Sequence, residues 1–255
     1  MRKRELLGES RNLSDLAPEG MFLGTSLILR QGGRLLYGVR PPRAEGSRCP
    51  EPASSRACRE AEGRQVIELT GIGGGVEEED ESPTAGVLRE VEEEIGCDVR
   101  LLPCRETLVV RGQDRIERVA LQGEERPVAL VFRRDRTPPH QPWHKDSQGE
   151  ACLVVFLAEL DGQPWPVTEQ ELSALIWLKP PHVLEMARRD VPLRELLNSG
   201  AEVVQSRLGI LPETAWVRMT DSQEALALAL GDGAVSFYEA LAETSEPDHN
   251  MGGQE

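Results

Sequence analysis

Residues 71–99 read GIGGGVEEEDESPTAGVLREVEEEIGCDV, and they hold ten acidic residues but a single arginine, Arg89. A short apolar run, 66-VIELT-70, precedes the glycines and predicts a strand that leads into them. So much negative charge has two interpretations. It is either an acidic face exposed to solvent, or a socket for a cation more highly charged than any side chain.

The second half of this stretch predicts one amphipathic helix. Ser82 followed by Pro83 is typical of a helix start, with the serine as N-cap and proline in the first turn. Gly96 stands where a helix ends in a left-handed residue. Three aliphatic residues lie three and four positions apart and are expected to pack inward: Leu88, Val91 and Ile95.

Three carboxylates, Glu90, Glu93 and Glu94, share a patch of this helix and fall roughly opposite the aliphatic stripe. Like charges at this spacing destabilise a helix by about 0.2–0.5 kcal/mol per pair. The macrodipole also disfavours anions near the C-terminus. A hard divalent cation would relieve this repulsion, because such ions take carboxylate oxygens and can bridge them to phosphate. Most of the neighbouring acidic residues are expected to be solvated charges: Glu77, Glu79, Asp80 and Glu92.

The spacing of these residues resembles the Nudix box over residues 75–97. The order is Gly75, five residues, Glu81, seven residues, Arg89-Glu90-Val91, one residue, Glu93-Glu94, one residue, Gly96. Cys97 replaces the aliphatic residue usual at the last position, and cysteine serves there as a small hydrophobe. The glycines 73–75 allow close approach to the backbone, but no Gly-Lys-Ser/Thr follows them as in a phosphate-binding P-loop.

The resemblance implies an α+β fold of the Nudix type, an α/β/α sandwich around a mixed sheet. It also implies hydrolysis of a nucleoside diphosphate linked to another moiety, with Mg²⁺ or Mn²⁺ as cofactor. The implied metal ligands are Glu90, Glu93 and Glu94, with Glu78 as a further candidate. By the same resemblance Arg89 would pair with Glu81 and hold the loop against the helix. A further acidic residue from outside the box is often recruited as ligand or base, and the candidates here are Glu169 and Glu171.

Composition indicates a folded protein that does not bind nucleic acid polymers. The 255-residue chain is 39% hydrophobic and 29% charged, and its net charge of −15 repels nucleic acids and anionic membranes. Five irregularly spaced cysteines predict neither disulfides nor a zinc site, which fits a reducing compartment. No apolar run reaches the roughly 20 residues of a membrane span. We therefore expect a cytoplasmic protein.

The organisation along the chain is expected to centre on one domain over residues 21–180, after an N-terminal segment, 1–20. Within it, 41–65 and 135–150 are polar and predict loops, the first of them mobile. Proline and glycine then bound two predicted helices, 180–189 and 192–200, and a third amphipathic segment covers 222–230. A helical extension over 181–243 and a disordered tail, 244–255, complete the prediction.

Two function classes remain open. The first is a metal-dependent pyrophosphohydrolase, in which water attacks the diphosphate bridge. The second is a non-catalytic Nudix-like domain that senses a nucleotide, although such domains commonly have a degenerate box and this one is intact. The sequence names no substrate-binding residue and does not choose between a monomer and a homodimer. A small nucleoside diphosphate derivative is the expected partner.

Overall fold

The computed structural model describes residues 11–17, 21–40, 65–111, 115–122, 126–134, 150–166, 172–206, 211–219 and Leu226. Most of the two predicted loops, the predicted segment 222–230 apart from Leu226, and the tail lie outside these residues. No helix within the described ranges is long and apolar enough to cross a membrane.

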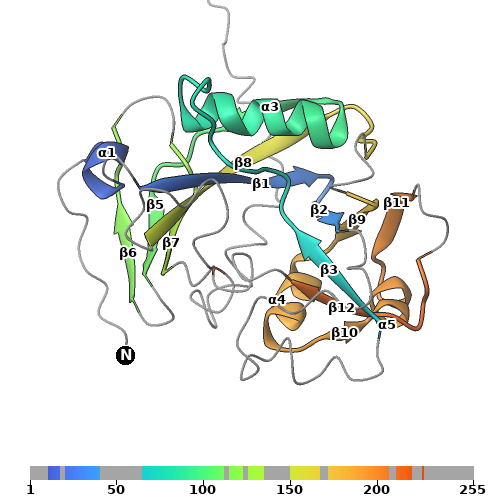
Figure 1. Cartoon of the computed structure of the whole chain (residues 1–255). Coiled ribbons are helices and arrows are strands. Elements are labelled where there is room, and N and C mark those ends of the chain that lie inside the picture. The colour runs from blue at the N-terminus through green and yellow to red at the C-terminus, as the bar shows by residue number, and fades with distance from the viewer. Residues whose placement is uncertain are drawn as a thin grey trace, which may run out of the picture.

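The predicted strand at 66–70 and the predicted helix that starts after Ser82 are both among the elements of the described chain (Figure 1). The helices are α1 (Leu13–Leu16), α3 (Pro83–Ile95), α4 (Pro180–Arg188) and α5 (Leu193–Asn198). The strands are β1 (Phe22–Gln31), β2 (Arg34–Val39), β3 (Val66–Thr70), β4 (Asp98–Leu102), β5 (Thr107–Arg111), β6 (Arg115–Val119), β7 (Ala129–Arg134), β8 (Glu150–Asp161), β9 (Ala174–Leu178), β10 (Val191–Pro192), β11 (Glu202–Ser206) and β12 (Trp216–Met219).

These strands form one mixed sheet, as predicted. Its main path runs β10-β12-β3-β2-β1-β8-β7-β5-β6, while β9 pairs with β2 and β11, and β4 pairs with β8. The β1–β2 hairpin turns at Gly32 and Gly33, which both have positive φ. On its other side β1 runs parallel to β8, from Phe22 opposite Ala151 to Arg30 opposite Glu159.

Strand alternation divides the hydrophobic core between the two faces of the sheet. Leu27 and Leu29 of β1 belong to the cluster beneath α3, whereas Ile28 belongs to the cluster shared with α4 and α5. Successive side chains of a strand point to opposite faces, so one apolar strand can supply both cores. In Figure 1 α3 lies over β1 and β8, with α4 and α5 on the other side. This is the predicted sandwich of helices around a mixed sheet.

Beyond β9 the structure contains more strand than the sequence predicts. The predicted helices at 180–189 and 192–200 are α4 and α5, but β10, β11 and β12 are interspersed with them. Strand β12 pairs in parallel with β3, with Trp216 opposite Val66 and Met219 opposite Leu69. The C-terminal region therefore contributes a neighbour to the strand that leads into the glycine-rich loop.

Candidate active site

Helix α3 begins and ends as the sequence predicts. The Ser82 hydroxyl accepts a hydrogen bond from the backbone N–H of Ala85 at 3.1 Å, and Pro83 is the first helical residue. At the other end Gly96 has φ 57°, and its N–H bonds the Val91 carbonyl at 3.1 Å. The N–H of Trp165 also reaches the Ile95 carbonyl at 3.0 Å. Both ends of the helix are thus fixed by local hydrogen bonds.

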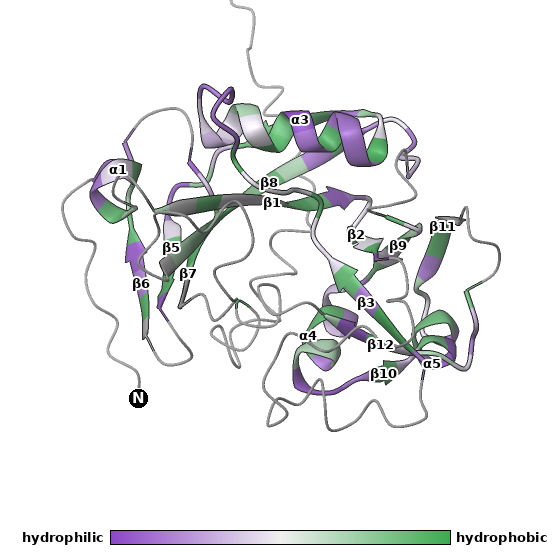
Figure 2. Ribbon diagram, in the orientation of Figure 1, coloured by the Kyte–Doolittle hydropathy of each residue, from purple (hydrophilic) through white to green (hydrophobic). Residues whose placement is uncertain are grey.

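The buried face of α3 differs from the prediction at one position. Val87, Val91 and Ile95 form the buried stripe, whereas Leu88 is 40% exposed. At about 100° per residue, Leu88 and Glu94 flank this stripe on opposite sides, each about 60° from its centre. The flank of Glu94 faces the glycine-rich loop and that of Leu88 faces outward, so the prediction that Leu88 packs inward is wrong. Figure 2 shows the apolar side of α3 toward the sheet.

The loop between β3 and α3 lies against β1. The N–H of Thr25 bonds the Gly74 carbonyl at 2.7 Å, and the N–H of Leu27 bonds the Ile72 carbonyl at 2.8 Å. Gly73 has φ 141°, and a Cβ there would lie 2.4 Å from the Thr25 carbonyl oxygen. Only glycine fits this conformation and this contact. The loop is therefore seated on the sheet directly beside the helix.

Two carboxylates of α3 turn toward this loop. Glu94 is only 6% exposed, and its Oε2 accepts a hydrogen bond from the N–H of Gly73 at 2.8 Å. Glu90 is packed so closely on Gly74 that a Cβ there would lie 2.3 Å from Glu90 Oε1. Glu93 stays at the surface, with its side chain 50% exposed. The expectation that all three lie opposite the apolar stripe is therefore wrong for Glu94, which borders it.

Arg89 donates hydrogen bonds to carboxylate and carbonyl oxygens of the loop and the helix. Its Nη1 lies 3.1 Å from Glu90 Oε1 and 3.2 Å from Glu93 Oε2, and its Nη2 donates to the Gly75 carbonyl at 3.0 Å. Its Nε and Nη2 donate to the two carboxylate oxygens of Asp80 at 3.2 and 3.1 Å. The bond to Asp80 is thus a bidentate pair, the geometry in which arginine binds carboxylates most specifically.

Arg89 therefore forms its bidentate pair with Asp80 and not with Glu81. Glu81 is exposed, while the side chain of Asp80 is only 7% exposed, so the expectation that Asp80 is a solvated charge is also wrong. The hydrogen bond from Arg89 holds the pKa of the Asp80 carboxyl below its usual value, with a smaller contribution from the Glu77 N–H. The same bond raises the pKa of Arg89 further above its ordinary range.

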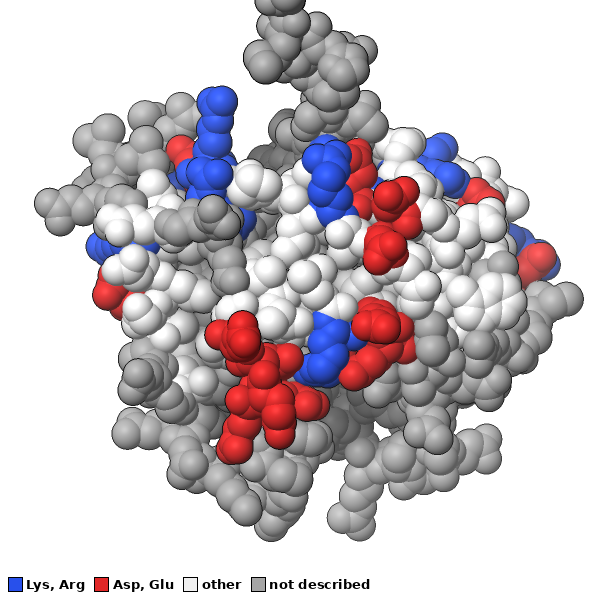
Figure 3. Space-filling view, turned by 90° about the horizontal axis from the view of Figure 1, so that it is seen from above, with Lys and Arg blue, Asp and Glu red and all other residues white. Residues whose placement is uncertain are grey.

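The remaining predicted site residues are less closely placed. Glu78 is exposed within the turn ahead of the helix, and Glu77 reaches to 3.9 Å from Arg89 Nη1. Glu169 and Glu171 lie outside the described residues. Acidic side chains gather on the molecular face that carries α3, with basic side chains among them (Figure 3). The described part of the chain holds no group of three His, Cys, Asp or Glu side chains close enough to enclose a metal ion.

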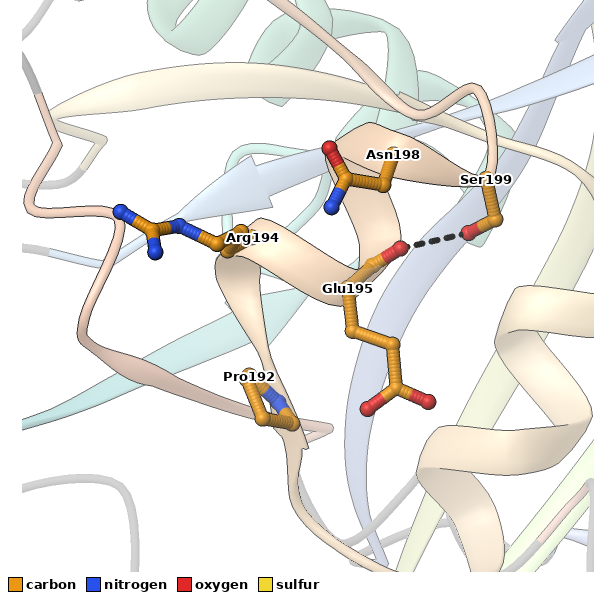
Figure 4. Close-up of a pocket in the computed structure, with 5 residues that line it drawn as sticks. All are labelled: Pro192, Arg194, Glu195, Asn198 and Ser199. Carbon is orange, nitrogen blue, oxygen red and sulfur yellow. Dashed lines mark hydrogen bonds between the residues drawn. The ribbon is translucent and has the colours of Figure 1, made fainter.

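A surface pocket beside α5 contributes nothing to this arrangement (Figure 4). Its lining residues are Pro192, Arg194, Glu195, Asn198 and Ser199. The Ser199 hydroxyl donates to the Glu195 carbonyl at 2.8 Å within the helix turn itself. No residue of α3 or of the glycine-rich loop borders the pocket.

Comparison with known proteins gives one family match. The model of the NUDIX domain matches residues 55–197, which include β3, the glycine-rich loop and all of α3. No curated protein matches the chain in sequence.

Solved structures with a similar chain trace include a MutT NUDIX hydrolase from Burkholderia pseudomallei, at 22% identity. The match covers 63% of this chain and 84% of that one, with a TM-score of 0.33. The dihydroneopterin triphosphate pyrophosphohydrolase of E. coli is 15% identical, and the match covers 66% of this chain and 85% of that one, with a TM-score of 0.36. A NUDIX hydrolase from Nitrosomonas europaea is 16% identical, and the match covers 75% of this chain and 95% of that one, also with a TM-score of 0.36. At these values the assignment rests on the family match alone.

Proposed function

The chain belongs to the Nudix family, and on that premise we propose that it hydrolyses a nucleoside diphosphate linked to a further group, using Mg²⁺ or Mn²⁺ held on α3. As a Nudix hydrolase it acts on phosphoric anhydrides. The observation that carries the proposal is the placement of two carboxylates, Glu90 and Glu94, against the backbone of the Gly73–Gly75 loop. The exposed carboxylate of Glu93 lies beside them.

The oxygen atoms of this site suit a hard divalent cation in kind. Glu90, Glu93 and the Gly75 carbonyl all direct oxygens at the positive guanidinium of Arg89. Carboxylate and carbonyl oxygens are the ligands that Mg²⁺ and Mn²⁺ take. Glu90 and Glu93, together with Glu94, which the family resemblance adds, would hold the cation. Glu78, exposed in the preceding turn, stays a further predicted ligand.

The residues of the site have different roles in this proposal. When bound, the cation would neutralise the diphosphate and make a water molecule more acidic. Glu93, whose side chain is half exposed, would accept a proton from that water as the general base. The water oxygen then bonds to phosphorus, and the bridging oxygen departs with the electron pair of the broken bond. The N–H of Gly73 donates to Oε2 of Glu94, which would fix the direction in which this carboxylate holds the cation.

The proposal is tested by hydrolysis of a panel of nucleotides with Mg²⁺ or Mn²⁺. The panel contains ADP-ribose, NADH, dinucleoside polyphosphates, and normal and oxidised nucleoside triphosphates. Glu93→Gln should reduce turnover of the hydrolysed compound about 10²–10⁴-fold, the range for a lost general base. Glu92→Gln is the matched control, because Glu92 is its exposed neighbour on the same helix and should keep full activity.

Two results would count against the proposal. Equal turnover in Glu93→Gln and Glu92→Gln would remove Glu93 from the reaction. A folded wild-type protein that binds a nucleotide from the panel but hydrolyses none of them would favour the nucleotide-sensing alternative. The roles of Glu169 and Glu171, the homodimer and the cytoplasmic location stay predictions.

A further inference from the structure

We propose that Asp80 is a positioning residue of this site and that it acts by fixing the guanidinium of Arg89. Through Arg89 it sets the places of the carboxylates of Glu90 and Glu93. The part concerning Arg89 stands on the geometry alone, whereas the consequence for a bound cation rests on the proposed function.

Asp80 is held more firmly than the acidic residues around it. Its Oδ2 accepts a hydrogen bond from the N–H of Glu77 at 2.8 Å, and its own N–H reaches the Glu77 carbonyl at 3.2 Å. These two bonds close a turn that points the carboxylate at the helix. There it meets Gly86, where a Cβ would come within 2.9 Å of Oδ2. A glycine in the first turns of α3 therefore leaves the room that the Asp80 carboxylate occupies.

Arg89 transmits this position to the rest of the site. One edge of its guanidinium, Nε and Nη2, is bound to Asp80, and Nη1 reaches Glu90 and Glu93. Nη2 also binds the Gly75 carbonyl. The guanidinium is planar and rigid, so fixing one edge fixes the direction of the other donors. A carboxylate on the loop thus determines where the acidic side chains of the helix meet a positive charge.

Removing the charge of Asp80 would leave the guanidinium of Arg89 mainly to Glu90 and Glu93, with Glu77 at 3.9 Å. Its positive charge would then be shared by three carboxylates instead of four, and each would hold it more strongly. A divalent cation would have to displace that stronger contact. We therefore expect weaker cation binding in Asp80→Asn, by about 10–100-fold, which is the usual effect of losing a residue that orients metal ligands.

The first experiment examines Arg89 without any metal. The Nε–H signal of Arg89 is recorded by NMR and assigned from its loss in Arg89→Lys. It should exchange slowly with water in the wild type and in Glu81→Gln, and should be lost to fast exchange in Asp80→Asn. Glu79→Gln, in the same turn, is the matched control and should behave as the wild type. Loss of the signal in Glu81→Gln, or its survival in Asp80→Asn, would overturn the assignment.

The second experiment measures Mn²⁺ affinity by electron paramagnetic resonance. Asp80→Asn should bind about 10–100-fold more weakly than Glu79→Gln. Because Asp80 acts through Arg89, adding Asp80→Asn to Arg89→Lys should cause little further loss. Additive losses would overturn the inference, since they would mean that Asp80 acts independently. If the wild type binds no Mn²⁺, the proposed function fails, and the NMR experiment still decides the inference.

Discussion

Replacing Gly74 by alanine should impair catalysis without weakening the fold. The new Cβ would lie 2.3 Å from Glu90 Oε1, so this oxygen must move by about 1.1 Å to reach an ordinary contact of 3.4 Å. A displacement of about 1 Å in a catalytic arrangement can cost about 10²-fold in rate. Gly74 has no positive φ, so alanine adds no backbone strain, and the smaller entropy of the unfolded chain favours it by about 0.4–1 kcal/mol.

The assay combines kcat/KM for the hydrolysed nucleotide, Mn²⁺ affinity and unfolding in urea. Gly32→Ala is the matched control, because Gly32 lies in the β1–β2 turn with φ 56° and open space around it. Strain at positive φ should lower its free energy of unfolding by about 1–2 kcal/mol while kcat/KM stays unchanged. The two variants should therefore show opposite patterns. If Gly74→Ala keeps wild-type kcat/KM and Mn²⁺ affinity, Gly74 does not confine Glu90 and the reasoning fails.

Two further predictions concern stability. Val87→Ala should lower the free energy of unfolding by roughly 1–3 kcal/mol, because Val87 is fully buried, and the exposed Leu88→Ala should cost less than about 1 kcal/mol. Equal losses in urea unfolding would contradict the observed face of α3. Burial, and then the charge of Lys179, lower the pKa of His182 below its usual 6.5. The contribution of neutral His182 to the free energy of unfolding should therefore be fully present above pH 6.5 and be lost as the pH drops through the lower pKa of the folded state. Urea midpoints measured from about pH 8 to about pH 5 should show this loss, and His182→Gln should remove part of it.

The features that were predictable from the sequence depend on neighbouring residues. The ends of α3 at Ser82 and Gly96 follow from side-chain and backbone hydrogen bonds within a few positions. Strand β3 follows from the short apolar run 66–70 that precedes the glycines. The spacing of the Nudix box likewise lies within one loop and one helix. Local chemistry was sufficient to locate the candidate site.

The wrong predictions concern features that depend on contacts with distant parts of the chain or on the exact geometry of a turn. Val87 and Leu88 are adjacent aliphatic residues, and the packing of α3 on the sheet, where Val87 joins Leu27 and Leu29 of β1 in one cluster, decides which of them is buried. Asp80 is one of five consecutive acidic residues, so only the geometry of the turn at Glu77 distinguishes it from Glu81. Its shorter side chain was the one available signal, since aspartate favours bonds to nearby backbone N–H groups.

The short strands of the C-terminal region were missed for the same reason. Strand β12 has only four residues, and β11 pairs with β9 through a register shift. Such strands have little propensity of their own and form because an open edge accepts them. Their existence therefore depends on β3 and β9 being in place, which no sequence window near residue 216 reveals.

The pairing of β3 with β2 and β12 affects how a truncated fragment would behave and how the chain folds during synthesis. Strand β3 leads into the glycine-rich loop, yet both β2 and β12 lie outside residues 55–197, the range that matches the family. A fragment trimmed to that range would leave β3 with unpaired N–H and C=O groups on both sides. During synthesis, likewise, β3 could pair with β12 only after almost all of the described chain had been made. The loop that carries Gly73 and Gly74 would be fully supported only at the end of folding.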